Sequence, residues 1–328
     1  FSEQVTLAGG TLDVALDSGG SVSITAFGPA TIASGTYTVL VTENSTDLTA
    51  TSPLTLSAGT LQDAAGNDTD LTIPGGQNIA DTKAIVVDTT APTISSVTSS
   101  TGDGTYGVGD TINVTVNFDE PVTLAGGTLN VALNSGGSVS IAAFGPALSA
   151  SGTYTVLATE NNSDLTATSP LTLSAGTLRD SAGNDTDLTI PGGQNIADTK
   201  ALVVDTTAPT ITDVTSSTGD GTYGVGETIN VTVNFSEPVT LSGGMLNVAL
   251  DSGGSVSITA FGPAMSASGT YTVLATQNST DLTATSPLTL SAGSLVDAGN
   301  NATDLAIPGG QNIADTKAIV VDTTAPTI

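Results

Sequence analysis

Residues 111–118 read Thr-Ile-Asn-Val-Thr-Val-Asn-Phe, so apolar side chains occupy every second position. This period of two is typical of a β-strand that buries one face. Gly, Asp, Asn and Pro cluster between this run and similar ones, whereas no stretch carries the apolar stripe of an amphipathic helix. Six further strands are expected at about 93–99, 128–134, 138–144, 153–159, 171–179 and 200–204.

Seven short antiparallel strands in just over a hundred residues predict an immunoglobulin-like β-sandwich, in which alternate side chains of two sheets fill one core. That core is small and aliphatic, because residues 89–205 hold only two Phe and two Tyr. Tyr154, with its equivalents Tyr37 and Tyr271, is expected to pack in the core rather than to serve through a hydrogen-bonded hydroxyl. The core candidates are Val114, Val116, Phe118, Leu129, Val131, Leu133, Val139, Ile141, Tyr154, Val156, Leu202 and Val204.

The sequence repeats with a period of 117 residues, as shown by Pro92, Pro209 and Pro326 in the phrase Asp-Thr-Thr-Ala-Pro-Thr-Ile. A period of this length indicates whole domains rather than solenoid units. We therefore predict an all-β fold of tandem immunoglobulin-like β-sandwich domains in an extended rod, cut from a longer array. The expected parts are a partial repeat that lacks its first two strands (1–88), two complete repeats (89–205 and 206–322) and the start of a further repeat (323–328).

The composition excludes several kinds of chemistry. The 328 residues include 31 acidic and 4 basic side chains, and no Cys, His or Trp. Disulfides, thiolate or imidazole catalysis and the usual zinc, haem or iron–sulfur sites are therefore not expected. A net charge of −27 repels nucleic acids and anionic lipid surfaces. No apolar run approaches the roughly 18 residues of a spanning helix, so membrane insertion is not expected either.

The acidic residues fall in particular loops of the predicted sandwich. Loops two strands apart share an end of such a domain. Glu120 and Asp180 are therefore expected beside the incoming linker at Asp88, and the loop that holds Asp103 and Asp110 is expected at the other end. There it would lie next to the outgoing linker at Asp205 and face the next copy. The acidic and amide side chains of that copy at this end are Glu237, Asp297 and Asn300.

Carboxylates gathered at a junction repel one another unless a cation neutralises them. Ca²⁺ suits such a site, because it takes six to eight oxygen ligands in flexible geometry, whereas Mg²⁺ demands a tighter octahedron. The linker Asp and the two acids of the adjoining loops are accordingly predicted to bind calcium. Asp103 and Asp110 are further candidate ligands. The alternative for all of these acids is a solvated turn residue, since Asp and Asn are favoured in turns.

Four phrases of the chain resemble bacterial immunoglobulin-like (Big-type) repeats of giant secreted adhesins and other large surface proteins. They are Val-Asp-Thr-Thr-Ala-Pro, Gly-Asp-Gly-Thr-Tyr-Gly-Val-Gly-Asp, Phe-Ser-Glu-Pro-Val and Asp-Ala-Ala-Gly-Asn. The resemblance implies a β-sandwich array with calcium near the domain junctions. It assigns calcium roles to Asp88, Glu120, Asp180, Asn184, Asp205, Glu237 and Asp297.

The third copy departs from this pattern, because it reads Asp297-Ala298-Gly299-Asn300-Asn301 and has one residue fewer before Gly-Asn. Asn300 is the candidate ligand taken here, with Asn301 as the alternative.

These observations predict a structural stalk or rod segment of an extracellular bacterial surface adhesin or fibre, with junctions stiffened by Ca²⁺. Its partners would be the neighbouring repeats of the same chain. Two alternatives remain: a filament assembled from like chains through edge strands, and a module that binds a surface polysaccharide or another partner. No enzyme is expected, because the fold alone argues for none and the paired carboxylates lack the aromatic platforms of a sugar-cleaving site.

Overall fold

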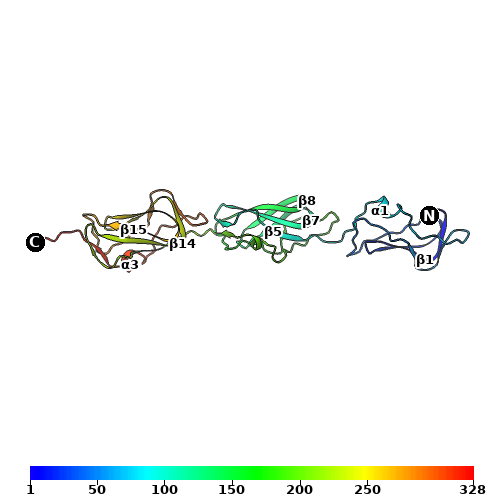
Figure 1. Cartoon of the computed structure of the whole chain (residues 1–328), viewed down its shortest axis with the longest axis horizontal. Helices are drawn as coiled ribbons and strands as arrows, with labels where there is room; N and C mark the ends of the chain where they lie inside the picture. Colours follow the sequence, from blue (N-terminus) through cyan, green and yellow to red (C-terminus); the bar gives the residue numbers. More distant parts are fainter.

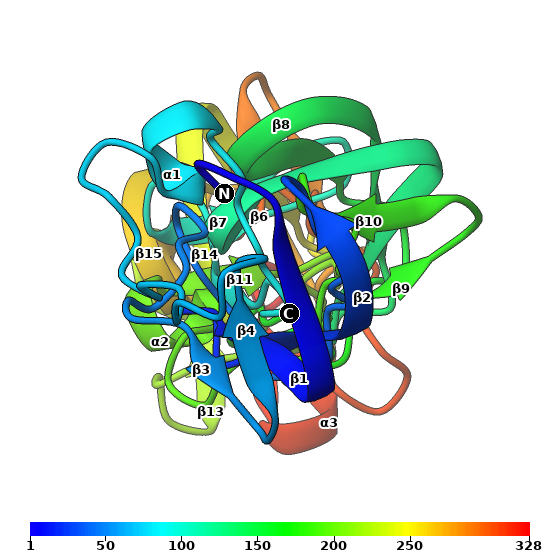
Figure 2. The ribbon, with the colours of Figure 1, turned by 90° about the vertical axis from the view of Figure 1, so that its right-hand side faces the viewer.

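The computed structural model describes all 328 residues and is all-β, with several antiparallel sheets and three helices of four residues. Figure 1 shows the strands in three groups that follow one another along the longest axis, and Figure 2 looks along that axis with β1 and β2 in front. We call residues 1–88, 89–205 and 206–322 units 1, 2 and 3. The longest helix has four residues, far fewer than a bilayer crossing requires.

Units 2 and 3 contain the same series of elements. In unit 2 these are β5 (Ile94–Thr98), β6 (Gly104–Tyr106), β7 (Thr111–Ala132), β8 (Ser138–Thr155), β9 (Thr172–Leu173), β10 (Thr177–Arg179), α2 (Ile196–Thr199) and β11 (Leu202–Val204). In unit 3 they are β12 (Ile211–Thr215), β13 (Gly221–Tyr223), β14 (Thr228–Ala249), β15 (Ser255–Thr272), β16 (Thr289–Leu290), β17 (Ser294–Val296), α3 (Ile313–Thr316) and β18 (Ile319–Val321).

Unit 1 has fewer elements. They are β1 (Val5–Ala15), β2 (Ser21–Ala30), β3 (Thr55–Leu56), β4 (Thr60–Gln62) and α1 (Ile79–Thr82). Strands β1 and β2 correspond to the second half of β7 and the first half of β8. The buried residues of unit 1 form two clusters of four, whereas units 2 and 3 hold single clusters of 24 and 22. Unit 1 therefore lacks a continuous core.

The strands expected at 111–118 and 128–134 are one strand, β7, and those at 138–144 and 153–159 merge in the same way into β8. The two long strands form one antiparallel hairpin that stays paired across register shifts between Asn117 and Leu124 and between Leu124 and Thr128. Gly126 and Gly127, both with positive φ, absorb part of this irregularity. The expectation that Glu120 lies in a loop was therefore wrong, because Asp119, Glu120 and Pro121 lie inside β7.

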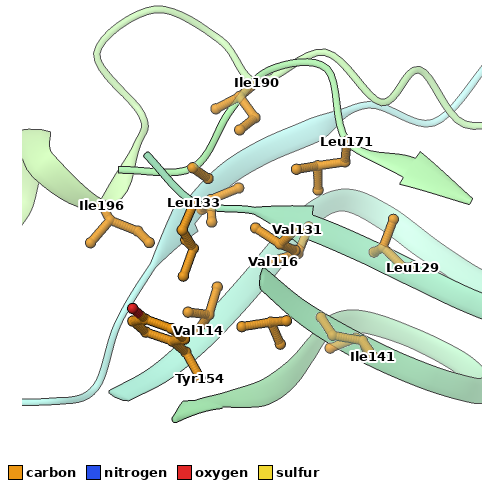
Figure 3. Close-up of a cluster of buried hydrophobic side chains, with 14 of the residues drawn as sticks. Val114, Val116, Leu129, Val131, Leu133, Ile141, Tyr154, Leu171, Ile190 and Ile196 are labelled. Carbon is orange, nitrogen blue, oxygen red and sulfur yellow. The ribbon is translucent and has the colours of Figure 1, made fainter. Parts of the chain in front are cut away.

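The two halves of β7 have different partners. Its first half pairs with β5 from Thr115 to Phe118, whereas its second half pairs with β9 and β10 between Thr123 and Asn130. Alternate apolar side chains of both halves meet in the single core of unit 2, and Figure 3 shows Val114 and Val116 near Val131. All twelve core residues predicted from the sequence are buried.

Two elements of each complete unit were not foreseen. The sequence at 104–106 gave no strand signal, yet β6 pairs in parallel with β11. Asn195 caps the N-terminus of the short helix α2: its side chain accepts a hydrogen bond from Ile196 N–H, and its own N–H donates to Asp198 Oδ2. Strand 171–179 is interrupted, so only its two ends, β9 and β10, pair with β7.

Tyr154 does more than fill the core. Its ring is buried, and its hydroxyl contacts Ser135 Oγ at 3.0 Å and donates to Glu160 Oε2 at 2.8 Å. Burial raises the pKa of Tyr154 to about 12. In unit 3 the acceptor is instead the neutral Gln277, at 2.8 Å from the Tyr271 hydroxyl. The expectation of plain packing was therefore incomplete, since the hydroxyl joins β8 to the loop that follows it.

We expect Tyr154→Phe to destabilise unit 2 by about 1.5–3 kcal/mol and Tyr271→Phe to destabilise unit 3 by only about 0.5–1.5 kcal/mol, because a hydrogen bond to a charged acceptor contributes more than one to a neutral acceptor. Hydrogen exchange of the amides in β8 and β15, measured by mass spectrometry on the whole chain, separates the two units. Equal losses in the two variants would contradict this assignment.

Candidate metal centre

Three carboxylates meet where unit 1 joins unit 2. Oxygens of Asp88, Glu120 and Asp180 all lie within 4.8 Å of one another. Asp88 follows Val87, which pairs with Ser45 of unit 1. Glu120 lies in the irregular middle of β7, and Asp180 directly follows β10, whose last residue Arg179 pairs with Thr123 of β7. The strand pairing thus brings both acids of unit 2 to the end of unit 1.

The same arrangement recurs one period later. Oxygens of Asp205, Glu237 and Asp297 also lie within 4.8 Å of one another, with Asp297 buried like Asp180. Each cluster takes one carboxylate from the preceding unit and two from the following unit. The sequence prediction that these six acids converge in two groups is therefore confirmed as geometry.

Hydrogen bonds hold the first linker from both sides. Asn44 of unit 1 accepts a bond from Thr89 N–H at 2.7 Å, and Asn184 of unit 2 donates to the carbonyl oxygen of Asp88 at 3.2 Å. Asp88 itself accepts from Thr90 N–H at 2.9 Å. Farther along, Asp119 accepts from both the amide and the hydroxyl of Thr93. The linker is thus tied to both units before any ion is considered.

The second linker is held in the same way. Asn161 accepts from Thr206 N–H at 2.7 Å, and Asn301 donates to the carbonyl oxygen of Asp205 at 2.9 Å. Asn301 also donates to Asp297 Oδ2 at 2.9 Å. The proline of each linker, Pro92 or Pro209, is buried, so neither linker is a free chain.

The clusters carry uncompensated negative charge. Burial raises the pKa of Glu120, and the neighbouring Asp88, Asp180 and Asp119 raise it further. Burial also raises the pKa of Glu237, with Asp205 and Asp297 adding to the shift. In both clusters the glutamate is thus the group whose pKa is raised by burial and by the nearby negative charges.

Asp180 responds differently. Burial acts to raise its pKa, but hydrogen bonds from the Asn184 side chain and from the amides of Asn184 and Gly183 outweigh burial and lower it. The hydrogen bonds thus favour the charged form of Asp180, whereas burial and the neighbouring acids disfavour the charged form of Glu120.

Asn301, rather than Asn300, makes the side-chain hydrogen bonds at the second cluster. Asn300 is exposed and takes a positive φ of 61°, at the position that Gly183 fills with a φ of 97° in unit 2. Asn301 is therefore the counterpart of Asn184, which favours the alternative to Asn300, and the assignment of Asn300 as a ligand stays a prediction. The signal was present in the sequence, because Asn301 stands 117 residues after Asn184.

Asp103 and Asp110 lie outside both clusters. Asp110 accepts from Gly107 N–H at 2.9 Å and closes a turn, whereas Asp103 accepts from Ala201 N–H at 3.1 Å and connects its loop to the residue before β11. Their loop still reaches unit 3, since a Cβ atom at Gly107 would overlap the carbonyl oxygen of Gly299. The loop therefore contributes close backbone packing to the second junction, where the sequence predicted carboxylates.

No protein-family model matches the chain, and none of the curated proteins compared matches it.

We expect Asn301→Ala to loosen the second junction, because it removes the bonds to Asp205 and Asp297, while Asn300→Gly leaves the junction intact, since glycine adopts a positive φ without strain. Hydrogen exchange of amides 205–210 checks this. Faster exchange in the Asn300→Gly chain than in the Asn301→Ala chain would reverse the assignment.

The raised pKa of Glu120 predicts a pH effect in a chain freed of divalent cations. A raised folded-state pKa gives stability that is fully present below the ordinary glutamate value of 4.5 and is lost as pH rises through the raised pKa. In EGTA, Glu120→Gln should therefore melt at a higher temperature than the unmodified chain at pH 7, and the difference should vanish near pH 4.

Asp164→Asn is the matched control, because it makes the same charge change at an exposed position outside the clusters. An equal gain in the Asp164→Asn chain would trace the effect to net charge alone.

Proposed function

We propose that the chain is a structural spacer: a rod of tandem immunoglobulin-like sandwiches whose junctions bind Ca²⁺, from an extracellular bacterial surface protein or fibre. The observation that carries this proposal is the pair of matched carboxylate clusters, each shared between two consecutive units. The 117-residue repeat and the three groups of strands along the axis in Figure 1 support the rod. The sequence resemblance to bacterial surface repeats supports the location.

The ligand set fits a hard cation. Each cluster offers three carboxylates, and the chain contains no cysteine or histidine. Ca²⁺ accepts such oxygen donors in irregular geometry and completes its shell with water. A hollow of about 370 Å³ beside the first cluster is lined by residues that include Asn44, Asp88, Thr90 and Glu120, which leaves room for that water.

A cation at this position would join two units. Asp88 belongs to the end of unit 1, whereas Glu120 and Asp180 belong to unit 2, so one ion would crosslink both across the linker. The bonds of Asn44 and Asn184 already limit the linker, and the ion would add a third restraint while removing the repulsion among the acids. Bending at the junction would then require loss of a ligand.

The proposal predicts a calcium-specific gain in stability. An ion that binds only the folded junction at 100 times its Kd adds about 2.7 kcal/mol. Calorimetric melting of the whole chain should therefore shift upward in Ca²⁺ but not in EGTA with Mg²⁺, and Glu237→Gln should lose about half of the shift, since one of two clusters remains. Small-angle scattering should show a longer, stiffer particle in Ca²⁺.

Asp281→Asn is the control for this experiment, because Asp281 is exposed and lies outside both clusters. Identical melting curves in the two buffers would reject calcium junctions and leave the acids as a solvated surface.

A further inference from the structure

Strand β8 has one open edge. It pairs with β7 alone, and no other backbone hydrogen bond joins residues 138–155 to a strand or loop on the other side. The opposite edges of unit 2 are covered: Val97 N–H of β5 donates to the Gln194 carbonyl oxygen at 2.8 Å, and the Leu178 carbonyl oxygen of β10 accepts from Thr186 N–H at 3.0 Å. The fold therefore leaves the β8 side of the unit open, with backbone N–H and C=O groups free to pair with another strand.

The open edge is repeated in unit 3 and carries no charge. β15 pairs with β14 alone, as β8 pairs with β7 alone. Residues 121–159 and 252–280, which contain β8 and β15, hold no Asp, Glu, Lys or Arg, although the chain as a whole has a net charge of −27. Charged side chains commonly protect an edge strand from pairing with another strand. A second copy of this acidic chain can therefore approach at these edges without placing carboxylate against carboxylate.

Residues 149–155 are the regular part of the β8 edge. They pair with residues 111–117 of β7 without a register shift, and the irregular stretch that includes Pro146 lies before them. β15 contains the same segment, Ser-Ala-Ser-Gly-Thr-Tyr-Thr, at 266–272. Units 2 and 3 therefore present an identical stretch of open strand.

The exposed face of this segment is complementary to itself. Its exposed side chains are all hydroxyl-bearing, namely Ser149, Ser151, Thr153 and Thr155. When two copies run antiparallel with Gly152 at the twofold axis, Ser151 of one copy faces Thr153 of the other. Ser149 then faces Thr155 in the same way. Such pairs of hydroxyl side chains across antiparallel strands stabilise the pairing.

Apolar side chains at the two ends of the segment add to this match. Leu148 is 55% exposed and Leu157 is 60% exposed, and their counterparts in unit 3, Met265 and Leu274, are 51% and 60% exposed. The antiparallel register about Gly152 brings Leu157 of one copy beside Leu148 of the other. Pairing therefore removes from water apolar surface that each of the two units exposes at the same positions.

We propose that β8 and β15 are self-association sites, at each of which a second copy of this chain adds its own 149–155 or 266–272 segment as an antiparallel strand. Main-chain hydrogen bonds along the open edges provide affinity, and the matched hydroxyl and apolar side chains fix the register. Figure 2 shows β8 and β15 on different sides of the long axis, so one molecule binds neighbours in two directions and forms an open assembly. The sites are independent of the proposed calcium junctions, because neither segment contains a cluster residue.

Sedimentation of the whole chain in EGTA tests the proposal, because chelation removes any association through cations. The average mass should rise with chain concentration, and more steeply in about 1 M NaCl, where the Debye length of about 3 Å screens the repulsion between acidic chains. Hydrogen exchange of amides 149–155 and 266–272 should slow about tenfold or more in the associated sample, whereas amides 94–98 of the covered strand β5 should not change. A chain that stays monomeric at both salt concentrations would overturn the proposal.

Ser151→Glu combined with Ser268→Glu should keep the chain monomeric, because each pairing would then hold two like charges on the same face. Both serines are exposed, so the fold is retained. The matched control is Ser163→Glu with Thr280→Glu, which adds the same charge at exposed loop positions outside both edges and should associate like the unmodified chain. Undiminished association of the first double variant would overturn the edge assignment. Equal loss in both double variants would also overturn it, because net charge alone would then govern association.

Discussion

The structure depends on one constraint on β7: a single strand must pair with β5 along its first half and with β9 and β10 along its second, while β8 follows it throughout. A regular strand cannot pair with both sets of partners, so the pairing of β7 with β8 shifts register near Glu120 and again at Gly126 and Gly127. The first irregularity bends the strand around the core and also places Glu120 at the end of the unit. The same irregularity of β7 therefore shapes the core and places Glu120 at the junction.

The junction balances opposing electrostatic effects. Three carboxylates lie close together, yet only Asp180 among the acids of unit 2 in the cluster receives enough hydrogen bonds to favour its charge, whereas Glu120 has a raised pKa. The asparagine that bonds Asp180 also bonds the preceding linker, so it connects the position of the linker to the ionisation of the cluster. The same pair of hydrogen bonds, to the linker and to the buried aspartate, is repeated at Asn301.

Much of this architecture could be read from the sequence, because alternation marks which face of a strand is buried and the 117-residue period marks equivalent positions. The continuity of β7 could not, since Asp-Glu-Pro and Gly-Gly resemble turns and only pairing with β8 keeps them in a strand. The clusters were foreseen from loop placement. Asn300 was preferred to Asn301 because a motif was followed instead of the period. The hydrogen bonds that Ala201 and Gly107 donate to Asp103 and Asp110 leave no trace in composition, so the sequence could not place these two carboxylates outside the clusters.

Each cluster takes its carboxylates from two consecutive units, and this has a mechanical consequence. Pulling units 1 and 2 apart moves Asp88 away from Glu120 and Asp180, so tension along the chain acts directly on the distances between the oxygens. Because coupling between two equilibria is reciprocal, an ion that resists this separation must itself bind less tightly under load. If calcium is bound there as proposed, each junction would release it as the chain stretches and rebind it on relaxation, and the linker would extend reversibly.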